Sequence, residues 1–250
     1  MLRYLLTTIS LLFILNATAT AQSLNDTVFI TEELPPYNFE IDGKPTGFAV
    51  DILLAALNAT GIKADISKVH VYPWPRAYKD VLAKPNHCLF STVRNNAREE
   101  LFKWAGPIAN YDVDFIATKG QIKINGIDDI KKFKISVIKN DIAYETILAE
   151  KFDEEHIDLS YSVISMIKKL NKGRVDIIAG NREAIFYKME QKNVNPHAYE
   201  VVFSLKMPPL YFAFNRYTND AVVRRLQIGI NKIKEEGKLD WLVRTYLPDN

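Results

Sequence analysis

The sequence predicts an α/β fold of two lobes that are joined by strand-like crossings. Short β-rich segments alternate with helical segments, which is the pattern of a sheet with crossover helices. The alternation occurs in two blocks, and neither a low-complexity tract nor a long linker separates them. We expect residues 22–118 and 206–250 to form one lobe and residues 119–205 the other, with a hinge between them.

The first block reads as strand, turn, helix, strand, helix and strand. Pro35 and Pro36 end the first strand, because proline cannot donate a backbone hydrogen bond. Thr60 and Gly61 end the first helix. The expected elements are strands over 27–31, 64–71 and 87–90, and helices over 47–57 and 76–82.

The second block repeats this α/β character. Ile164, Ile167 and Leu170 share one helix face, and Gly173 ends that helix before a buried-looking strand. The expected strands cover 111–118, 134–138, 157–161 and 175–179, and the expected helices cover 128–130, 141–151 and 162–170. The chain then returns through strands over 200–205 and 211–215, a long helix after Asn219 and a final helix over 239–246.

The first 21 residues are predicted to be a secretory signal peptide. Arg3 precedes an apolar run over residues 4–15, and Ala19-Thr20-Ala21 is a small-residue cleavage pattern. The run is too short to span a bilayer, and no cysteine follows it that could accept a lipid. We therefore expect a protein that is free in the periplasm.

Charge and cysteine content narrow the function. Removing residues 1–21 takes away one arginine and no acid, so the net charge of +2 falls to +1. This argues against binding to nucleic acid or to a membrane surface. Cys88 is the only cysteine, and the four histidines lack metal-ligand spacing. We expect a monomer without a metal or cofactor.

A segment after the strand over 87–90 is a candidate anion site. Arg94 and Arg98 lie four residues apart, among the hydroxyl and amide groups of Ser91 and Asn95. The planar guanidinium of arginine suits a carboxylate better than other side chains do. A solvated helix face is the alternative, because Glu99 and Glu100 lie beside the arginines.

Two further residues are candidates with simpler alternatives. Trp74 lies between two prolines and is either a core aromatic residue or a stacking surface for a ligand. Asp141 is either a helix N-cap or a carboxylate for a cationic group.

Four motifs occur in an order that resembles the type II periplasmic solute-binding proteins of ABC amino-acid transporters, the bacterial extracellular family-3 group. The resemblance covers nearly all of the chain after the predicted signal peptide. The motifs are Pro36-Tyr37 with Gly47-Phe48-Ala49-Val50-Asp51-Ile52; Arg98 with Trp104 and Pro107; Leu170 to Asp176; and Ile233 to Tyr246.

The resemblance implies that a ligand binds between the two lobes. Arg98 would then bind the ligand carboxylate, with help from the strand end that includes Ser91, and Trp74 would form a wall. Asn140 and Asp141 match a helix start that contacts the carboxylate in this family, where free N–H groups favour an anion.

The sequence also departs from the family pattern. Asn95 replaces a threonine before the arginine, and Asn140-Asp141 replaces a Gly-Thr pair. Asn181 stands where an acid usually holds the ligand ammonium, and an amide cannot neutralise that charge. Either Asp141 supplies the missing charge or the ligand lacks an amino group. Arg94 is an additional cation that is available for a second carboxylate.

The expected function is capture of a small carboxylate-bearing solute, an amino acid or a related polar compound. Delivery to an ABC permease in the inner membrane would follow. One alternative is a lyase related to cyclohexadienyl dehydratases, with Glu33 or Glu183 as the acid. Another is a binder that signals to a receptor.

Overall fold

The computed structural model of the chain describes residues 23–247. The predicted signal peptide, residues 1–21, lies outside the described residues. None of the described helices is long and apolar enough to cross a membrane.

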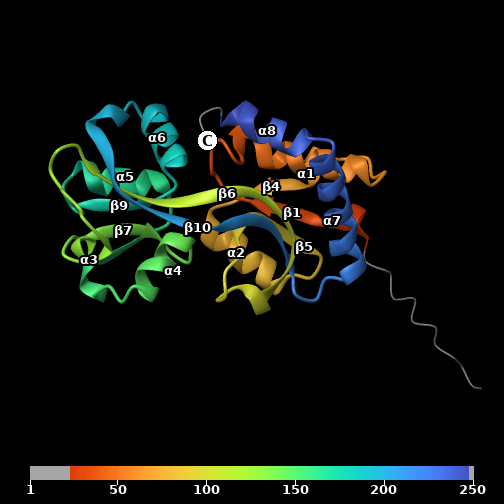
Figure 1. Cartoon of the computed structure of the whole chain (residues 1–250), viewed down its shortest axis with the longest axis horizontal. Coiled ribbons are helices and arrows are strands. Elements are labelled where there is room, and N and C mark those ends of the chain that lie inside the picture. The colour runs from red at the N-terminus through yellow and green to blue at the C-terminus, as the bar shows by residue number, and fades with distance from the viewer. Residues whose placement is uncertain (1–22, 248–250) are drawn as a thin grey trace, which may run out of the picture.

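Two long antiparallel strands, β6 (Phe102–Thr118) and β10 (Tyr199–Asn215), form the centre of an eight-stranded sheet. The strand order is β4-β1-β5-β10-β6-β9-β7-β8. One end of β10 pairs with β5, and the opposite end of β6 pairs with β9. The two strands therefore run from one lobe into the other, as Figure 1 shows. The predicted α/β fold of two lobes joined by strands is confirmed.

Each lobe has parallel strands beside the long pair and helices around them (Figure 1). The first lobe contains β1 (Val28–Thr31), β4 (Val69–Val71), β5 (His87–Val93), α1 (Phe48–Ala59), α2 (Trp74–Ala83), α7 (Asp220–Glu235), α8 (Lys238–Tyr246) and the hairpin of β2 (Phe39–Ile41) and β3 (Lys44–Thr46). The second lobe contains β7 (Ile135–Ile138), β8 (Ile157–Ser160), β9 (Ile177–Gly180), α3 (Ile127–Ile130), α4 (Ile142–Ala149), α5 (Val163–Asn171) and α6 (Arg182–Gln191). The residue boundaries of the lobes stay a prediction, because β6 and β10 belong to both.

Polar side chains at the N-caps explain where several helices begin. The side-chain oxygens of Asp141, Ser162, Asn181 and Asn219 each accept a hydrogen bond from a backbone N–H of the first turn. Such a bond satisfies a donor that the helix itself leaves free. The caps of α4 and α6 also place Asp141 and Asn181 at the boundary between the lobes.

Several elements differ from the sequence-based expectation. The strand expected over 111–118 belongs to β6, which begins at Phe102, and the β2–β3 hairpin was not predicted. The strand expected over 64–71 is limited to β4, because the Asp65 side chain caps a short 3-10 turn before it. The strands expected over 200–205 and 211–215 are one strand, β10, with irregular register between them. Helix α6 was not predicted, since only Ala184, Ile185 and Met189 of its ten residues are buried.

The packing of α1 against α7 depends on a glycine. A Cβ atom at Gly229 of α7 would lie 2.2 Å from the carbonyl oxygen of Ala56 and 3.0 Å from a carbon of Thr60. The backbone of α1 approaches α7 at this point, and no side chain larger than hydrogen fits. The contact joins the two largest helices of the first lobe.

Replacing Gly229 with alanine is expected to destabilise the protein by about 1–3 kcal/mol, because the added methyl group overpacks this contact. In an exposed helix the same change would stabilise by about 1 kcal/mol. Urea unfolding followed by circular dichroism measures the difference. Ile228→Ala, at the neighbouring exposed position, is the control and should change stability little. A more stable Gly229→Ala variant would contradict the packing.

Candidate functional site

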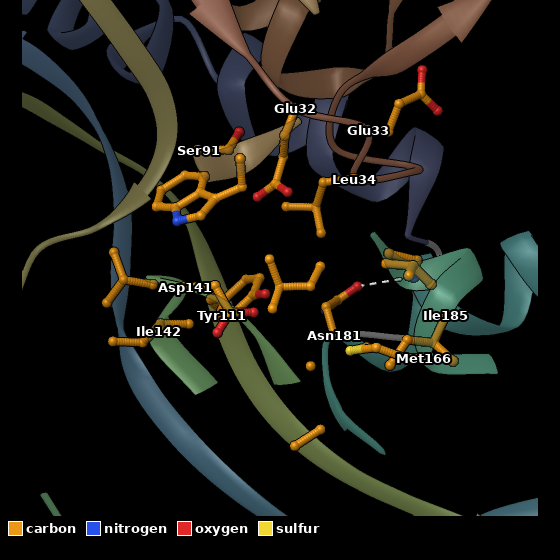
Figure 2. Close-up of a pocket in the computed structure, with 17 residues that line it drawn as sticks. Glu32, Glu33, Leu34, Ser91, Tyr111, Asp141, Ile142, Met166, Asn181 and Ile185 are labelled. Carbon is orange, nitrogen blue, oxygen red and sulfur yellow. Dashed lines mark hydrogen bonds between the residues drawn. The ribbon is translucent and has the colours of Figure 1, made fainter. Parts of the chain in front are cut away.

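A cavity of about 40 Å³ lies between the two lobes (Figure 2). It adjoins an outer cavity of about 200 Å³, since Glu32, Glu33, Trp74, Ile138 and Val163 line both. The inner cavity is also lined by Leu34, Ser91, Val93, Tyr111, Asp141, Ile142, Met166, Ala179, Gly180, Asn181, Ala184 and Ile185. Its described lining contains three acids and no basic side chain.

Glu32 enters the cavity from the first lobe. It directly follows β1, at the carboxyl end of a parallel strand, where α/β sheets usually place functional groups. Asn38 fixes this turn, since its Nδ2 donates to the Glu32 carbonyl oxygen at 2.8 Å and its Oδ1 accepts from the Ser91 hydroxyl. Figure 2 shows the Glu32 side chain extending into the cavity, whereas Glu33 points away.

Asp141 enters the same cavity from the second lobe. Its Oδ1 accepts the capping hydrogen bond from the Tyr144 N–H at 2.8 Å. Its Oδ2 takes no part in that bond. Figure 2 shows Asp141 beside Tyr111 and across from Glu32. Closure of the lobes therefore brings two carboxyl groups from different elements to one space.

Burial raises the pKa values of these acids. The pKa of Glu32 rises to about 8 through burial and the nearby charge of Asp141, and the charge of Arg98 opposes the rise. The pKa of Asp141 rises to about 7 through burial, although the Tyr144 N–H and Arg98 oppose it. Both shifts disfavour the charged forms of the two carboxyl groups. A ligand cation would supply the missing counter-charge.

Arg98 lies next to this cavity but is already paired. Its Nε and Nη2 donate to Glu145 Oε1 of α4 at 2.9 and 2.8 Å. Its Nη1 and Nη2 make longer bonds, of 3.5 and 3.4 Å, to the carbonyl oxygens of Val93 and Asn140. The side chain is 1% exposed. The predicted anion site is thus a bridge between the lobes in this structure.

The residues around Arg98 complete the bridge. Asn95 accepts a hydrogen bond from the Arg98 N–H at 3.0 Å and donates one to Glu145 Oε2 at 2.9 Å. The Trp74 indole donates to the Asn140 carbonyl oxygen at 2.6 Å, and its ring lies 5.3 Å from the Arg98 guanidinium carbon. Trp74 therefore lines the cavity and also lies against the arginine of the ion pair.

Arg94 lies elsewhere. It forms an ion pair with Glu99 at 2.6 Å, and its guanidinium carbon lies 5.4 Å from the centre of the Tyr211 ring. This group borders a separate hollow with Pro208 and Pro209, outside the inner cavity. Of the other candidate residues, only the adjacent Asn95 lines this hollow with Arg94.

The structure thus sorts the eight candidates into three positions. Ser91, Trp74, Asp141 and Asn181 line the inner cavity; Arg98, Asn95 and Asn140 take part in the bridge; and Arg94 lies outside.

Asn181 and Ser91 are both engaged. Asn181 caps α6 by accepting from the Ala184 N–H at 3.0 Å. Ser91 has a left-handed backbone, with φ of 59°, and its hydroxyl donates to Asn38. These residues shape the cavity wall, and the acids opposite them supply its charge.

Sequence reasoning missed Glu32, Tyr111 and Glu145. Glu32 stands at a strand end before two prolines, which is a usable signal for a cleft residue. Glu145 follows Asp141 by four residues and so lies on the same face of α4. No local pattern indicates that it reaches Arg98, which is 47 residues away in sequence.

Comparison with known proteins identifies the family. Residues 27–249 match the Bacterial extracellular solute-binding proteins, family 3. No curated protein sequence matches the chain. Within residues 23–247, no group of three or more histidine, cysteine or acidic residues could hold a metal ion.

Solved structures share the fold at low identity. A histidine kinase sensor domain with similarity to periplasmic binding proteins is 16% identical, covers 88% of this chain and 96% of its own, and has a TM-score of 0.78. An ancestral arginine-binding protein bound to arginine is 16% identical, with coverage of 88% and 98% and a TM-score of 0.75. The arginine-, lysine-, histidine-binding protein ArtJ from Geobacillus stearothermophilus is 16% identical, with coverage of 90% and 96% and a TM-score of 0.71.

The family match spans almost all of the described chain, and the fold agrees with it. The chain belongs to the bacterial extracellular solute-binding proteins of family 3.

Proposed function

We propose that this protein captures a small solute with a protonated nitrogen group between its lobes and delivers it to an ABC importer. The observation that carries the proposal is the pair of carboxyl groups, Glu32 and Asp141, which enter one cavity from opposite lobes. A cation between them would contact both lobes at once. A ligand favours the closed state only if it binds that state better than the open one.

The cavity chemistry supports a nitrogen cation over an anion. The described lining of the inner cavity has no basic side chain, and the lysine at the outer cavity, Lys188, pairs with Glu33 at 2.5 Å. Similar folds include proteins named for binding arginine, and for binding arginine, lysine and histidine. A ligand carboxylate at Arg98 is not part of this proposal, because Glu145 occupies that guanidinium here. The periplasm remains the proposed location.

Two other functions have one observation each in their favour. A signalling role is supported by the likeness to a histidine kinase sensor domain. A lyase role is supported by Glu32, a carboxyl whose raised pKa suits proton transfer. The acids first considered for it are engaged elsewhere, since Glu33 pairs with Lys188 and Glu183 pairs with Arg182. Incubation with prephenate or arogenate would reveal such activity as phenylpyruvate or phenylalanine.

Small nitrogen cations are expected to raise the melting temperature, and amine-free acids are not. The measurement is a thermal-shift screen with L-arginine, L-lysine, agmatine and cadaverine against succinate and glutarate. Native mass spectrometry of protein purified without refolding tests the same point on any retained solute. If only the amine-free acids stabilise the protein, the proposed ligand class is wrong.

Replacing Glu32 with glutamine is expected to weaken binding of the best cation in that screen by about 30- to 100-fold, or 2–3 kcal/mol. The reason is that a charge-assisted bond is lost inside a desolvated site. Isothermal titration calorimetry measures the loss. Glu40→Gln, at the exposed end of the same cleft, is the matched control and should change affinity less than threefold. If both variants lose the same binding affinity, Glu32 is not part of the binding site.

Cation affinity is expected to rise with pH between about 6 and 8. Below their pKa values of about 8 and 7, Glu32 and Asp141 carry protons that a bound cation must displace. The logarithm of the association constant should rise by up to about two units per pH unit below pH 7, by about one between pH 7 and 8, and then level off. The charges that face Glu32 come from Asp141, Arg98 and Glu33.

The folding stability of the ligand-free protein should depend on pH in the opposite direction to the cation affinity. Because the folded-state pKa values are raised, the folded state binds more protons than the unfolded state between about pH 4.5 and 8. Its stability should therefore fall as the pH rises through this range. Calorimetric titrations and melting curves from pH 5 to 9 measure both trends, and Glu32→Gln should flatten each. A cation affinity that is independent of pH would contradict the assignment.

A further inference from the structure

The Arg98–Glu145 pair has the form of an arginine bound to a ligand carboxylate. Glu145 Oε1 accepts from Nε and Nη2 of Arg98, and its Oε2 accepts from the Asn95 amide at 2.9 Å. Both carboxylate oxygens are therefore used. The three groups come from two lobes, because Arg98 and Asn95 follow β5 and Glu145 belongs to α4.

A ligand carboxylate could reach Arg98 only by displacing Glu145. All three guanidinium nitrogens have acceptors within the protein, and the side chain is 1% exposed. Displacement would leave the Glu145 carboxylate, whose side chain is 25% exposed, without its two partners. Separating a mostly buried charge from its partner is costly, and the ligand would have to offset that cost.

The cavity itself offers a carboxylate no compensation. Arg98 is not among the residues that line it, and the Nε1 of Trp74, which does line it, is committed to the Asn140 carbonyl oxygen. The charged groups that face the inner cavity are acids, Glu32 and Asp141 among them. Once these acids are ionised, a ligand anion placed there would meet like charges, whereas a cation would meet opposite charges.

We propose that Glu145 takes the place of the ligand carboxylate, so that the cleft selects amines or guanidines without a carboxylate over the corresponding α-amino acids. The inference rests on the proposed capture of a nitrogen cation and narrows the chemical class of the ligand. The protein carries the anion for Arg98 on its own second lobe. The ligand then has only to supply the cation for Glu32 and Asp141.

The outer cavity indicates what the rest of the ligand resembles. It has about 200 Å³ of space beyond the acids, and apolar and aromatic side chains form much of its wall, including Tyr72, Tyr161, Val163 and Ile164. Such a surface suits the methylene chain or ring of a small organic cation. The ligand class is therefore a short alkyl or aryl amine or guanidine.

A matched pair of compounds tests the inference. Agmatine and L-arginine differ only by the carboxylate, and cadaverine and L-lysine form a second such pair. Calorimetry with the full mature protein at pH 8 should show the decarboxylated member of a pair binding at least tenfold more tightly. If L-arginine or L-lysine binds more tightly than its decarboxylated partner, this inference is wrong but the proposed capture of a nitrogen cation is not. If none of the four compounds binds, the proposed function fails as well.

Variants of Glu145 give a readout that a merely structural role would not move. Glu145→Ala frees Arg98, so the affinity ratio of agmatine to L-arginine should fall at least tenfold. Glu145→Gln keeps the size of the side chain and should shift the ratio in the same direction if the alanine variant folds poorly. Glu150→Ala removes an exposed charge at the C-cap of the same helix and should leave the affinity ratio unchanged. An unchanged ratio in both Glu145 variants would overturn the inference.

Discussion

The ion pair between Arg98 and Glu145 is the interaction on which the arrangement of the cleft depends. It joins the segment after β5 to helix α4, and Asn95 and Asn140 attach to it from either lobe. Because the pair is largely enclosed, it holds the lobes in a defined relation rather than acting as a weak surface contact. The positions of Trp74, Asp141 and Glu32 in the cavity follow from this closed relation.

The same pair sets the charge of the cavity. An arginine directed into the cleft would neutralise the nearby acids, but Arg98 is held by Glu145 and is not among the residues that line the cavity. Glu32 and Asp141 therefore remain without a basic partner among the residues that line the cavity, and burial raises their pKa values. Asn181 belongs to this arrangement, since an acid at the start of α6 would add a third charge nearby.

The fold could be predicted from the sequence to a larger extent than the site. Prolines, glycines, caps and apolar periodicity are local signals, and they located β1, α1, α5 and α7 nearly correctly. The site depends on contacts between segments that lie far apart, such as Glu145 with Arg98 and Trp74 with Asn140. Arg98 carries the family motif and Arg94 does not, but no local pattern indicates that Arg98 is buried against Glu145 while Arg94 lies outside on Glu99.

The most direct test of the account is a crystal structure of the protein with the solute that it retains on purification. The account predicts that Glu145 still lies within hydrogen-bond distance of Arg98, about 3 Å, and that a ligand nitrogen lies between Glu32 and Asp141. A ligand carboxylate on Arg98, with Glu145 displaced from it, would contradict the account.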